Sequence, residues 1–318
     1  MPLWKWLLLI AYYHASLPAR WWIHRNLVAR RRAPIVVIYY HRIADDAATE
    51  WTMSNRAFIE QMCWLRRNFE LISMAEAQQR LRSGANTRPA LHITFDDGYA
   101  DNCHRAIPWL VAQRIPCTYF VTVQNILEGR PFEHDLKVGR DLRPNSLAEV
   151  RAMAKAGIEI GAHTYSHPDL ARLTDPARLR REIVTARQEL CAVLGREIRY
   201  FSFPFGRHAN LSMPAFEIAA ESGYECVCSA YGGYNFPGDD SFHLQRIAAV
   251  GELLRMKNWL NADPRKLYTR RFQYRWGEKQ VAWSGEQGAG IMQFSLPAPC
   301  SLPADDSRQT EEHHVLST

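Results

Sequence analysis

Between Pro34 and about Leu260, short apolar runs alternate with stretches whose apolar residues recur at helical spacing. The runs that we expect to form strands are 35–40, 91–95, 117–123, 158–162, 200–203, 224–228 and 243–250. Such alternation predicts an α/β fold with a parallel sheet, open or closed into a barrel, because parallel strands need a helical crossover between them. The chain has no phosphate-binding glycine loop, so an open nucleotide-binding sheet is the weaker choice.

The clearest predicted helix begins after Asp175 and ends at Gly195. Asp is a good N-cap, Pro176 fits the first helical turn, and glycine suits the residue that ends a helix. Leu179, Ile183 and Leu190 keep one apolar face between these ends. Further helices are expected around 58–65, 107–111, 147–156 and 213–222, and before Leu260.

The chain has 318 residues, of which 47% are hydrophobic, and can therefore bury one large core. We expect a basic and aromatic N-terminal helix at 1–33 and a single domain at 34–262. The remainder, 263–318, is first basic and then rich in Pro, Ser and Ala with little apolar periodicity. That composition predicts a disordered tail.

The first 32 residues contain six Lys or Arg and no acidic residue. The apolar stretch from Leu3 to Tyr13 is too short to span a membrane, which needs about 20 apolar residues. It also lacks the clean apolar region and cleavage site of a signal peptide. The mixture of Trp and Arg fits peripheral contact with an anionic membrane surface, or a helix packed on the main domain. The residues favour both equally.

Seven cysteines are present, none with Cys-x-x-Cys spacing, and their number is odd. We therefore expect reduced, mostly buried thiols rather than a disulfide framework. This favours the cytoplasm or the cytoplasmic face of a membrane, with the cell envelope as the alternative. The net charge of +6 comes from basic segments without an aromatic-interleaved basic face, so we expect no nucleic-acid partner.

Two polar clusters directly follow predicted strands. Asp96 and Asp97 come after strand 91–95, and His163 and His167 come after strand 158–162. Neighbouring strand residues point to different sides, so one Asp can bind a metal while the other acts as a base. Either cluster alone would also fit an acidic turn or a structural histidine. Together, one Asp and two His make a ligand set that suits zinc or another divalent metal.

Three segments carry a family resemblance. Thr94–Gly98 reads Thr-Phe-Asp-Asp-Gly, His163–Pro168 pairs two histidines before a proline, and Phe203–Gly206 reads Phe-Pro-Phe-Gly. In this order they resemble the three main motifs of the polysaccharide deacetylases of carbohydrate esterase family four. The resemblance covers about 34–260. It implies a distorted (β/α) barrel of about seven parallel strands, and metal-dependent removal of acetyl groups from N-acetylated sugars.

The resemblance also implies roles for individual residues. Asp97, His163 and His167 would bind the metal, with Zn²⁺ as the first choice and Co²⁺, Ni²⁺ or Mn²⁺ as alternatives. Asp96 would be the general base. Phe205, Pro204 and Tyr99 would contact the substrate or form the oxyanion site. The partner would be an acetylated glycan.

Two positions depart from the family pattern. The family usually has an Arg before its third motif, where this chain has Ser202, and a late Leu-x-His, where this chain has Leu244-Gln245-Arg246. However, Tyr40-His41 resembles the permuted subgroup that includes poly-N-acetylglucosamine deacetylases. That resemblance implies His41 as the general acid. Arg246 would orient Asp96 in place of the missing Arg.

Two further functions stay open on the sequence alone. The same scaffold could serve an esterase that removes O-acetyl groups from carbohydrates. The two departures also fit a degenerate carbohydrate-binding scaffold without catalytic activity.

Overall fold

The computed structural model describes residues 3–267 and 269–274, and its centre is a parallel β-sheet. The strand order is β10-β9-β8-β7-β6-β5-β1-β11, with the short β4 beside β5. The bounds are β1 Ile35–Tyr40, β4 Glu70–Leu71, β5 Ala90–Phe95, β6 Cys117–Val121, β7 Glu159–Ala162, β8 Tyr200–Ser202, β9 Cys226–Ser229, β10 His243–Gln245 and β11 Ile247–Ala248. A separate two-stranded sheet pairs β2 (Arg42–Ile43) with β3 (Thr52–Met53).

The sheet curls so that its two ends meet. β10 and β11 lie at opposite ends of the strand order, yet only Arg246 separates them in the chain. Leu244 pairs with β9, and Ile247 pairs with β1. One residue can connect the two edges only if they lie close together, which confirms the distorted (β/α) barrel. The single strand that we expected at 243–250 is therefore divided at Arg246.

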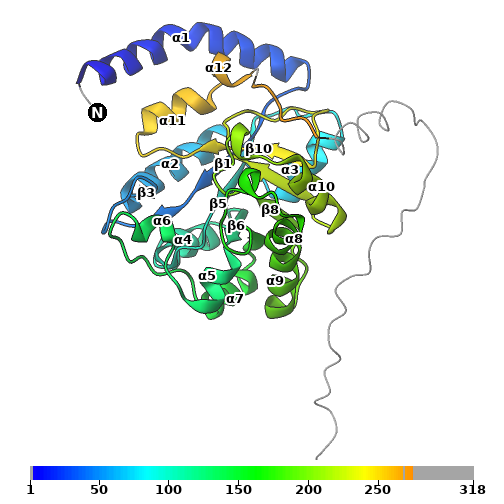
Figure 1. Cartoon of the computed structure of the whole chain (residues 1–318). Helices are drawn as coiled ribbons and strands as arrows, with labels where there is room; N and C mark the ends of the chain where they lie inside the picture. The colour runs from blue at the N-terminus through cyan, green and yellow to red at the C-terminus, as the bar shows by residue number, and fades with distance from the viewer. Residues whose placement is uncertain (1–2, 268, 275–318) are drawn as a thin grey trace, which may run out of the picture.

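Helices surround this barrel (Figure 1). Their bounds are α1 Leu3–Ala29, α2 Asn55–Asn68, α3 Met74–Arg82, α4 Ala106–Ala112, α5 Val123–Glu128, α6 Glu133–Leu136, α7 Leu147–Lys155, α8 Pro176–Arg180, α9 Ala186–Leu194, α10 Met213–Glu221, α11 Leu253–Leu260 and α12 Pro264–Leu267. The helix predicted between Asp175 and Gly195 is α8 and α9, joined by a π-helical turn at Arg181–Thr185. Asp175 accepts a hydrogen bond from Ala177 N, and Gly195 takes the left-handed conformation, as expected.

The core has two large apolar parts, besides a small cluster around Tyr99. The larger lies between the barrel and its helices and includes Leu91, Ile93 and Phe95 of β5. The smaller fills one end of the barrel and includes Ile35 and Phe120. Because strand side chains alternate, every second residue of β5 points into the barrel instead of toward the helices. These inward residues are polar near the carboxyl end of the strand, where the candidate site lies.

The ends of the described chain lie on the outside of the barrel. Helix α1 packs against α11 (Figure 1). The Tyr274 ring stacks on Phe216 with 4.3 Å between centroids, so the first residues of the predicted tail lie against the barrel. The rest of that tail falls outside the described residues, and the domain limits stay a prediction. No helix in the described part of the chain combines the length and apolarity needed to cross a membrane.

Candidate active site

A cavity of about 770 Å³ opens where the carboxyl ends of several strands meet. This is the end at which parallel barrels place their functional loops. Six of the predicted site residues line the cavity: His41, Asp96, Asp97, His163, His167 and Phe205. They follow four different strands, so the barrel brings together residues that are far apart in the sequence.

The three predicted metal ligands converge. Asp97 Oδ1 lies 3.4 Å from His163 Nε2 and 3.2 Å from His167 Nε2. One ligand atom from each residue lies within 4.8 Å of the other two. The sequence could propose this set, but only the fold shows that loops after β5 and β7 place it at one point.

The surroundings of these residues fit a divalent cation. Asp97 Oδ1 is buried and has no hydrogen-bond partner in the described structure. His163 Nδ1 lies 2.9 Å from the carbonyl oxygen of Ser202, which leaves Nε2 directed at Asp97. Such a contact fixes the tautomer of a metal-binding histidine. Burial would raise the pKa of Asp97, but the neighbouring imidazoles hold it well below its usual range. A carboxylate and two imidazoles are ligands that zinc accepts.

Arg246 binds Asp96 with two parallel hydrogen bonds. Nη1 donates to Oδ1 at 2.7 Å and Nη2 to Oδ2 at 2.8 Å. Arg246 is fully buried and also donates to the hydroxyls of Thr94 and Ser202. Burial alone would raise the pKa of Asp96, but Arg246 keeps it below its ordinary value. The guanidinium therefore holds Asp96 ionised in one orientation, as expected for a substitute of the missing Arg.

Unusual backbone conformations gather at this site. Asp97, Thr164, His167 and Phe205 all have φ between 60° and 72°. Residues with a Cβ rarely adopt this left-handed region, and such strain persists where surrounding contacts enforce it. The Phe205 turn shows one such contact. A Cβ on the following Gly206 would lie 2.7 Å from the Ala230 Cβ, so only glycine fits there.

His41 lies on the same cavity at the end of β1. Its side chain is half-buried and meets the Tyr39 ring edge-on, with 5.5 Å between centroids. It lines the same cavity as Asp96 and Asp97. This position is compatible with the acid role implied by the resemblance.

Two predicted substrate contacts do not reach the cavity. Tyr99 is fully buried, and its hydroxyl donates to Asp135 Oδ2 at 2.7 Å. Pro204 is buried within its turn, where its carbonyl oxygen accepts a hydrogen bond from Gly206 N. Neither residue is among those that line the cavity. Tyr99 instead packs with Phe132 and Leu142 in a small apolar cluster beside Trp51.

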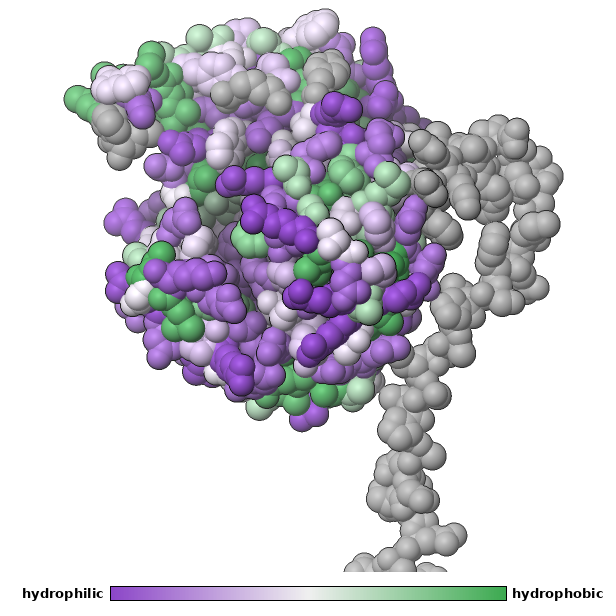
Figure 2. Space-filling view, in the orientation of Figure 1, coloured by the Kyte–Doolittle hydropathy of each residue, from purple (hydrophilic) through white to green (hydrophobic). Residues whose placement is uncertain are grey.

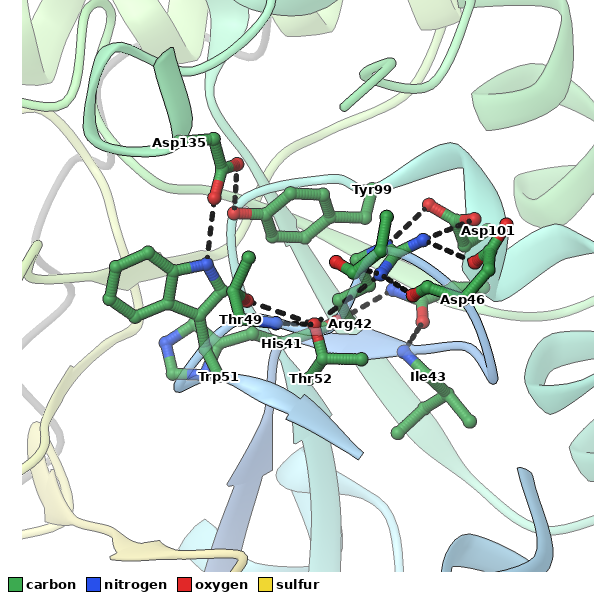
Figure 3. Close-up of polar contacts among 12 residues, drawn as sticks. His41, Arg42, Ile43, Asp46, Thr49, Trp51, Thr52, Tyr99, Asp101 and Asp135 are labelled. Atoms are coloured by element: carbon green, nitrogen blue, oxygen red, sulfur yellow. Dashed lines mark hydrogen bonds and ion pairs between the residues drawn. The ribbon is translucent and has the colours of Figure 1, made fainter. Parts of the chain in front are cut away.

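Trp51 and His134 line the cavity although the sequence did not single them out as site residues. Trp51 Nε1 donates to Asp135 Oδ1 at 2.9 Å, and the same carboxylate accepts from Tyr99 (Figure 3). His134 lies beside His167, with 5.3 Å between ring centroids. The only sequence signal for them was position, since both residues lie in segments that follow predicted strands.

The loop that carries Trp51 is fixed by a buried arginine. Arg42 has 1% of its side chain exposed and binds Asp46 and Asp101 (Figure 3). It also donates to the carbonyl oxygen of Ala47. A guanidinium bound on both sides holds the chain between β2 and β3 in one shape. Trp51 is therefore part of a rigid wall of the cavity.

The loop that carries His167 is held by Glu182. This buried carboxylate accepts hydrogen bonds from Ser166 N at 2.8 Å and Ser166 Oγ at 2.7 Å. Glu182 belongs to the π-helical turn between α8 and α9. π-bulges occur frequently at functional sites. The helical periodicity expected between Asp175 and Gly195 did not predict this contact, because the π turn changes the direction in which side chains such as Glu182 point.

Comparison with known proteins finds similarity to polysaccharide deacetylases. Residues 83–227 match the polysaccharide deacetylase family model. The chain is 25% identical over 217 residues to the Bacillus subtilis (strain 168) protein named "Putative polysaccharide deacetylase YxkH", covering 68% of this chain and 71% of that protein. It is 30% identical over 154 residues to poly-beta-1,6-N-acetyl-D-glucosamine N-deacetylase of Escherichia coli O157:H7, covering 45% of this chain but only 23% of that protein.

The fold agrees with a solved structure. IcaB from Ammonifex degensii superposes with a TM-score of 0.62 at 23% identity, covering 72% of this chain and 98% of IcaB. At this identity the likeness concerns the fold. His41, Trp51 and Arg246 lie outside residues 83–227, so the family match does not bear on them.

Proposed function

Because this chain carries a polysaccharide deacetylase domain, we propose that it hydrolyses the acetamide of an N-acetylated sugar in a poly- or oligosaccharide or a glycoconjugate. The observation that carries this proposal is the convergence of Asp97, His163 and His167 beside Asp96 at the cavity. That combination provides cation ligands and a separate base within one site.

The proposed roles combine what the family resemblance implies with the geometry of the site. Asp97, His163 and His167 would bind a divalent cation, Zn²⁺ being our first choice, which would supply Lewis-acid polarisation and acidify a water molecule. Asp96, fixed by Arg246, accepts the proton of the attacking water. His41 donates a proton to the departing amine, which is a poor leaving group until it is protonated. A backbone N–H of the Phe205 turn stabilises the oxyanion.

The walls of the cavity suggest how a sugar is bound. Trp51 and Phe205 present aromatic surface to the cavity, and Phe205 is 55% exposed. Aromatic rings combine a large apolar face with low conformational freedom, which suits the flat faces of sugar rings. Glu50, Arg207 and Asn210 add polar groups along the same walls for sugar hydroxyls. We infer that the substrate lies between Trp51 and Phe205.

Acetate release tests the proposed reaction. The enzyme should release acetate from N-acetylglucosamine oligomers, lose this activity with a chelator, and regain it with Zn²⁺. Acetylated xylan serves as the O-acetyl substrate. Faster release from xylan would show that the protein is a carbohydrate esterase instead. Metal bound without release from either substrate would contradict hydrolysis.

The degenerate-scaffold alternative loses its two main supports. Arg246 binds Asp96 in place of the missing Arg, and His41 lies on the cavity. For the compartment, our proposal stays the cytoplasm or the cytoplasmic face of a membrane. The described residues include six cysteine thiols, and four of them are buried, namely Cys117, Cys191, Cys226 and Cys228. A membrane surface, the second partner that the sequence suggests, would meet α1, which contributes no residue to the cavity.

A further inference from the structure

Polar contacts hold helix α1 on the barrel. Arg20 is 1% exposed and donates to the carbonyl oxygens of Asn258 and Asn261 at 2.6 and 2.8 Å. These carbonyls lie at the end of α11, where a helix favours a cation. Tyr12 donates to Asp263 on the same side. The docking of α1 is therefore specific and largely polar.

Several large apolar side chains of α1 face outward. Trp4, Leu8, Trp21 and Trp22 are each about 60% exposed. A helix on a globular protein normally buries its apolar face and exposes its polar face. Helix α1 instead exposes these four large apolar side chains, which leaves apolar surface uncovered in the described structure. Such a surface marks an interaction site.

The N-terminal end of α1 extends beyond the barrel. Every residue from Leu3 to Leu8 is exposed, and five of these six are Leu or Trp. Figure 1 shows this end of the helix projecting past the body of the molecule. In Figure 2 hydrophobic residues gather on it at the upper left. This end of the helix can therefore enter an apolar environment without disturbing the barrel.

The charges of this segment select the partner. Residues 1–32 carry six basic residues and no acidic one. Lys5 lies over the Trp4 ring at 5.3 Å, and Arg25 over the Trp21 ring at 5.4 Å. Tryptophan with adjacent cations is typical of the membrane interface, where the ring lies among headgroups and the cation meets phosphate. A second protein chain would explain the apolar surface but not the uniform charge.

We propose that the outward face of α1 binds an anionic phospholipid surface, with Trp4, Leu8, Trp21 and Trp22 entering the interface and Lys5 and Arg25 contacting lipid phosphates. The attachment also orients the cavity. Helix α11, on which α1 packs, begins directly after Val250, Gly251 and Glu252, which line the cavity. A rigid connection of this kind fixes the distance between the cavity rim and the lipid surface. This inference does not depend on the proposed reaction.

Vesicle flotation tests the proposal with the full chain. The protein should float with phosphatidylcholine vesicles that contain phosphatidylglycerol, bind vesicles of phosphatidylcholine alone more weakly, and dissociate as salt is added. The double variant Trp21→Ser/Trp22→Ser should lower the partition coefficient at least about tenfold. Lys5→Gln/Arg25→Gln should lower it on anionic vesicles by about fivefold for each charge removed. Met213→Ser, which removes an exposed apolar residue from α10, is the matched control and should bind as the parent does.

Several outcomes would overturn this proposal. One is a parent protein that does not float with anionic vesicles. Another is a parent that floats while both α1 double variants bind equally well. A third is a dimer in light scattering that Trp21→Ser/Trp22→Ser dissociates, without vesicle binding, because the apolar face would then belong to a second copy. Circular dichroism of each variant shows whether α1 is intact, and the charge variant keeps the test valid if the Trp variant misfolds.

Discussion

The Arg246 guanidinium holds both carboxylate oxygens of Asp96 at 2.7 and 2.8 Å, across 150 residues of chain. The contact exists because Arg246 lies at the junction where β10 and β11 close the barrel. The same residue thus closes the sheet and positions the proposed base. Substitution of Arg246 should therefore affect both the free energy of unfolding and the proposed reaction, and the two effects can be measured separately.

Removing Arg246 should destabilise the protein and reduce turnover. Arg246→Met leaves Asp96 buried without its cation, which should cost about 3–5 kcal/mol of unfolding free energy. Adding Asp96→Asn should recover part of this loss, because the uncompensated charge disappears. Urea denaturation of both single variants and the double variant gives the coupling energy. Strictly additive effects would show that the pair is not coupled.

Loss of a ligand should separate metal binding from proton transfer. Asp97→Ala and His163→Ala should lose both bound metal and acetate release, since each removes one converging ligand atom. Asp96→Asn should keep the metal and lose the activity. Elemental analysis of the purified variants gives the metal content, with His104→Ala at an exposed histidine as the matched control. Full metal content in Asp97→Ala would refute the ligand set.

His41→Ala should slow amide hydrolysis more than ester hydrolysis. A general acid typically contributes about 10²–10⁴-fold, and an amine needs protonation more than an alcohol does. We expect kcat on N-acetylglucosamine oligomers to fall within that range, with a smaller loss on an acetate ester. Steady-state kinetics on both substrates gives the comparison. Equal losses on both would assign His41 to the structure of the site instead.

Trp51 should contribute to substrate binding rather than to chemistry. Trp51→Ala should raise KM about tenfold for N-acetylglucosamine oligomers and change kcat little, since aromatic contacts are typically worth about 0.5–1.5 kcal/mol. Trp51→Phe removes the hydrogen bond to Asp135 but keeps an aromatic face. Its KM should therefore lie between that of the parent protein and that of Trp51→Ala. A fall in kcat with unchanged KM would contradict this role.

Acidification should destabilise the fold through His92 and His243. Burial lowers the pKa of His92 to about 4 and that of His243 to about 3. Unfolded histidine has a pKa near 6.5, so below that pH the unfolded chain binds protons that the native state does not. The two histidines therefore leave the free energy of unfolding unchanged above about pH 6.5 and lower it as the pH falls toward 4. Urea unfolding across this range measures the slope.

The matched variants isolate the contribution of His92. His92→Asn can keep a donor toward the Ile72 carbonyl oxygen, which lies 2.8 Å from His92 Nδ1. This variant should reduce the slope of unfolding free energy against pH, whereas His104→Asn at an exposed position should leave it unchanged. An unaltered slope in His92→Asn would mean that other groups control acid unfolding.

The convergence of Asp97, His163 and His167 was predictable because its signal is local. Asp96 and Asp97 directly follow an apolar strand, and His163 and His167 follow another. Parallel strands bring their carboxyl ends to one edge, so the sequence could place these four residues together. The same rule fails for Tyr99, because its direction depends on the turn made by Asp97 and Gly98, both with positive φ. Periodicity does not extend through such a turn.

The sequence by itself determined the alternation of strands and helices and the residue types of the Asp-His-His cluster, since these follow from apolar periodicity and local motifs, and the family resemblance implied the barrel. Only the tertiary structure decided which distant residues join them. Trp51 becomes a cavity wall through Asp135, and Arg246 reaches Asp96 because the barrel closes at that residue. The outward apolar face of α1 likewise depends on how Arg20 docks against α11. Contacts between distant segments depend on closure and packing geometry, which local patterns do not encode.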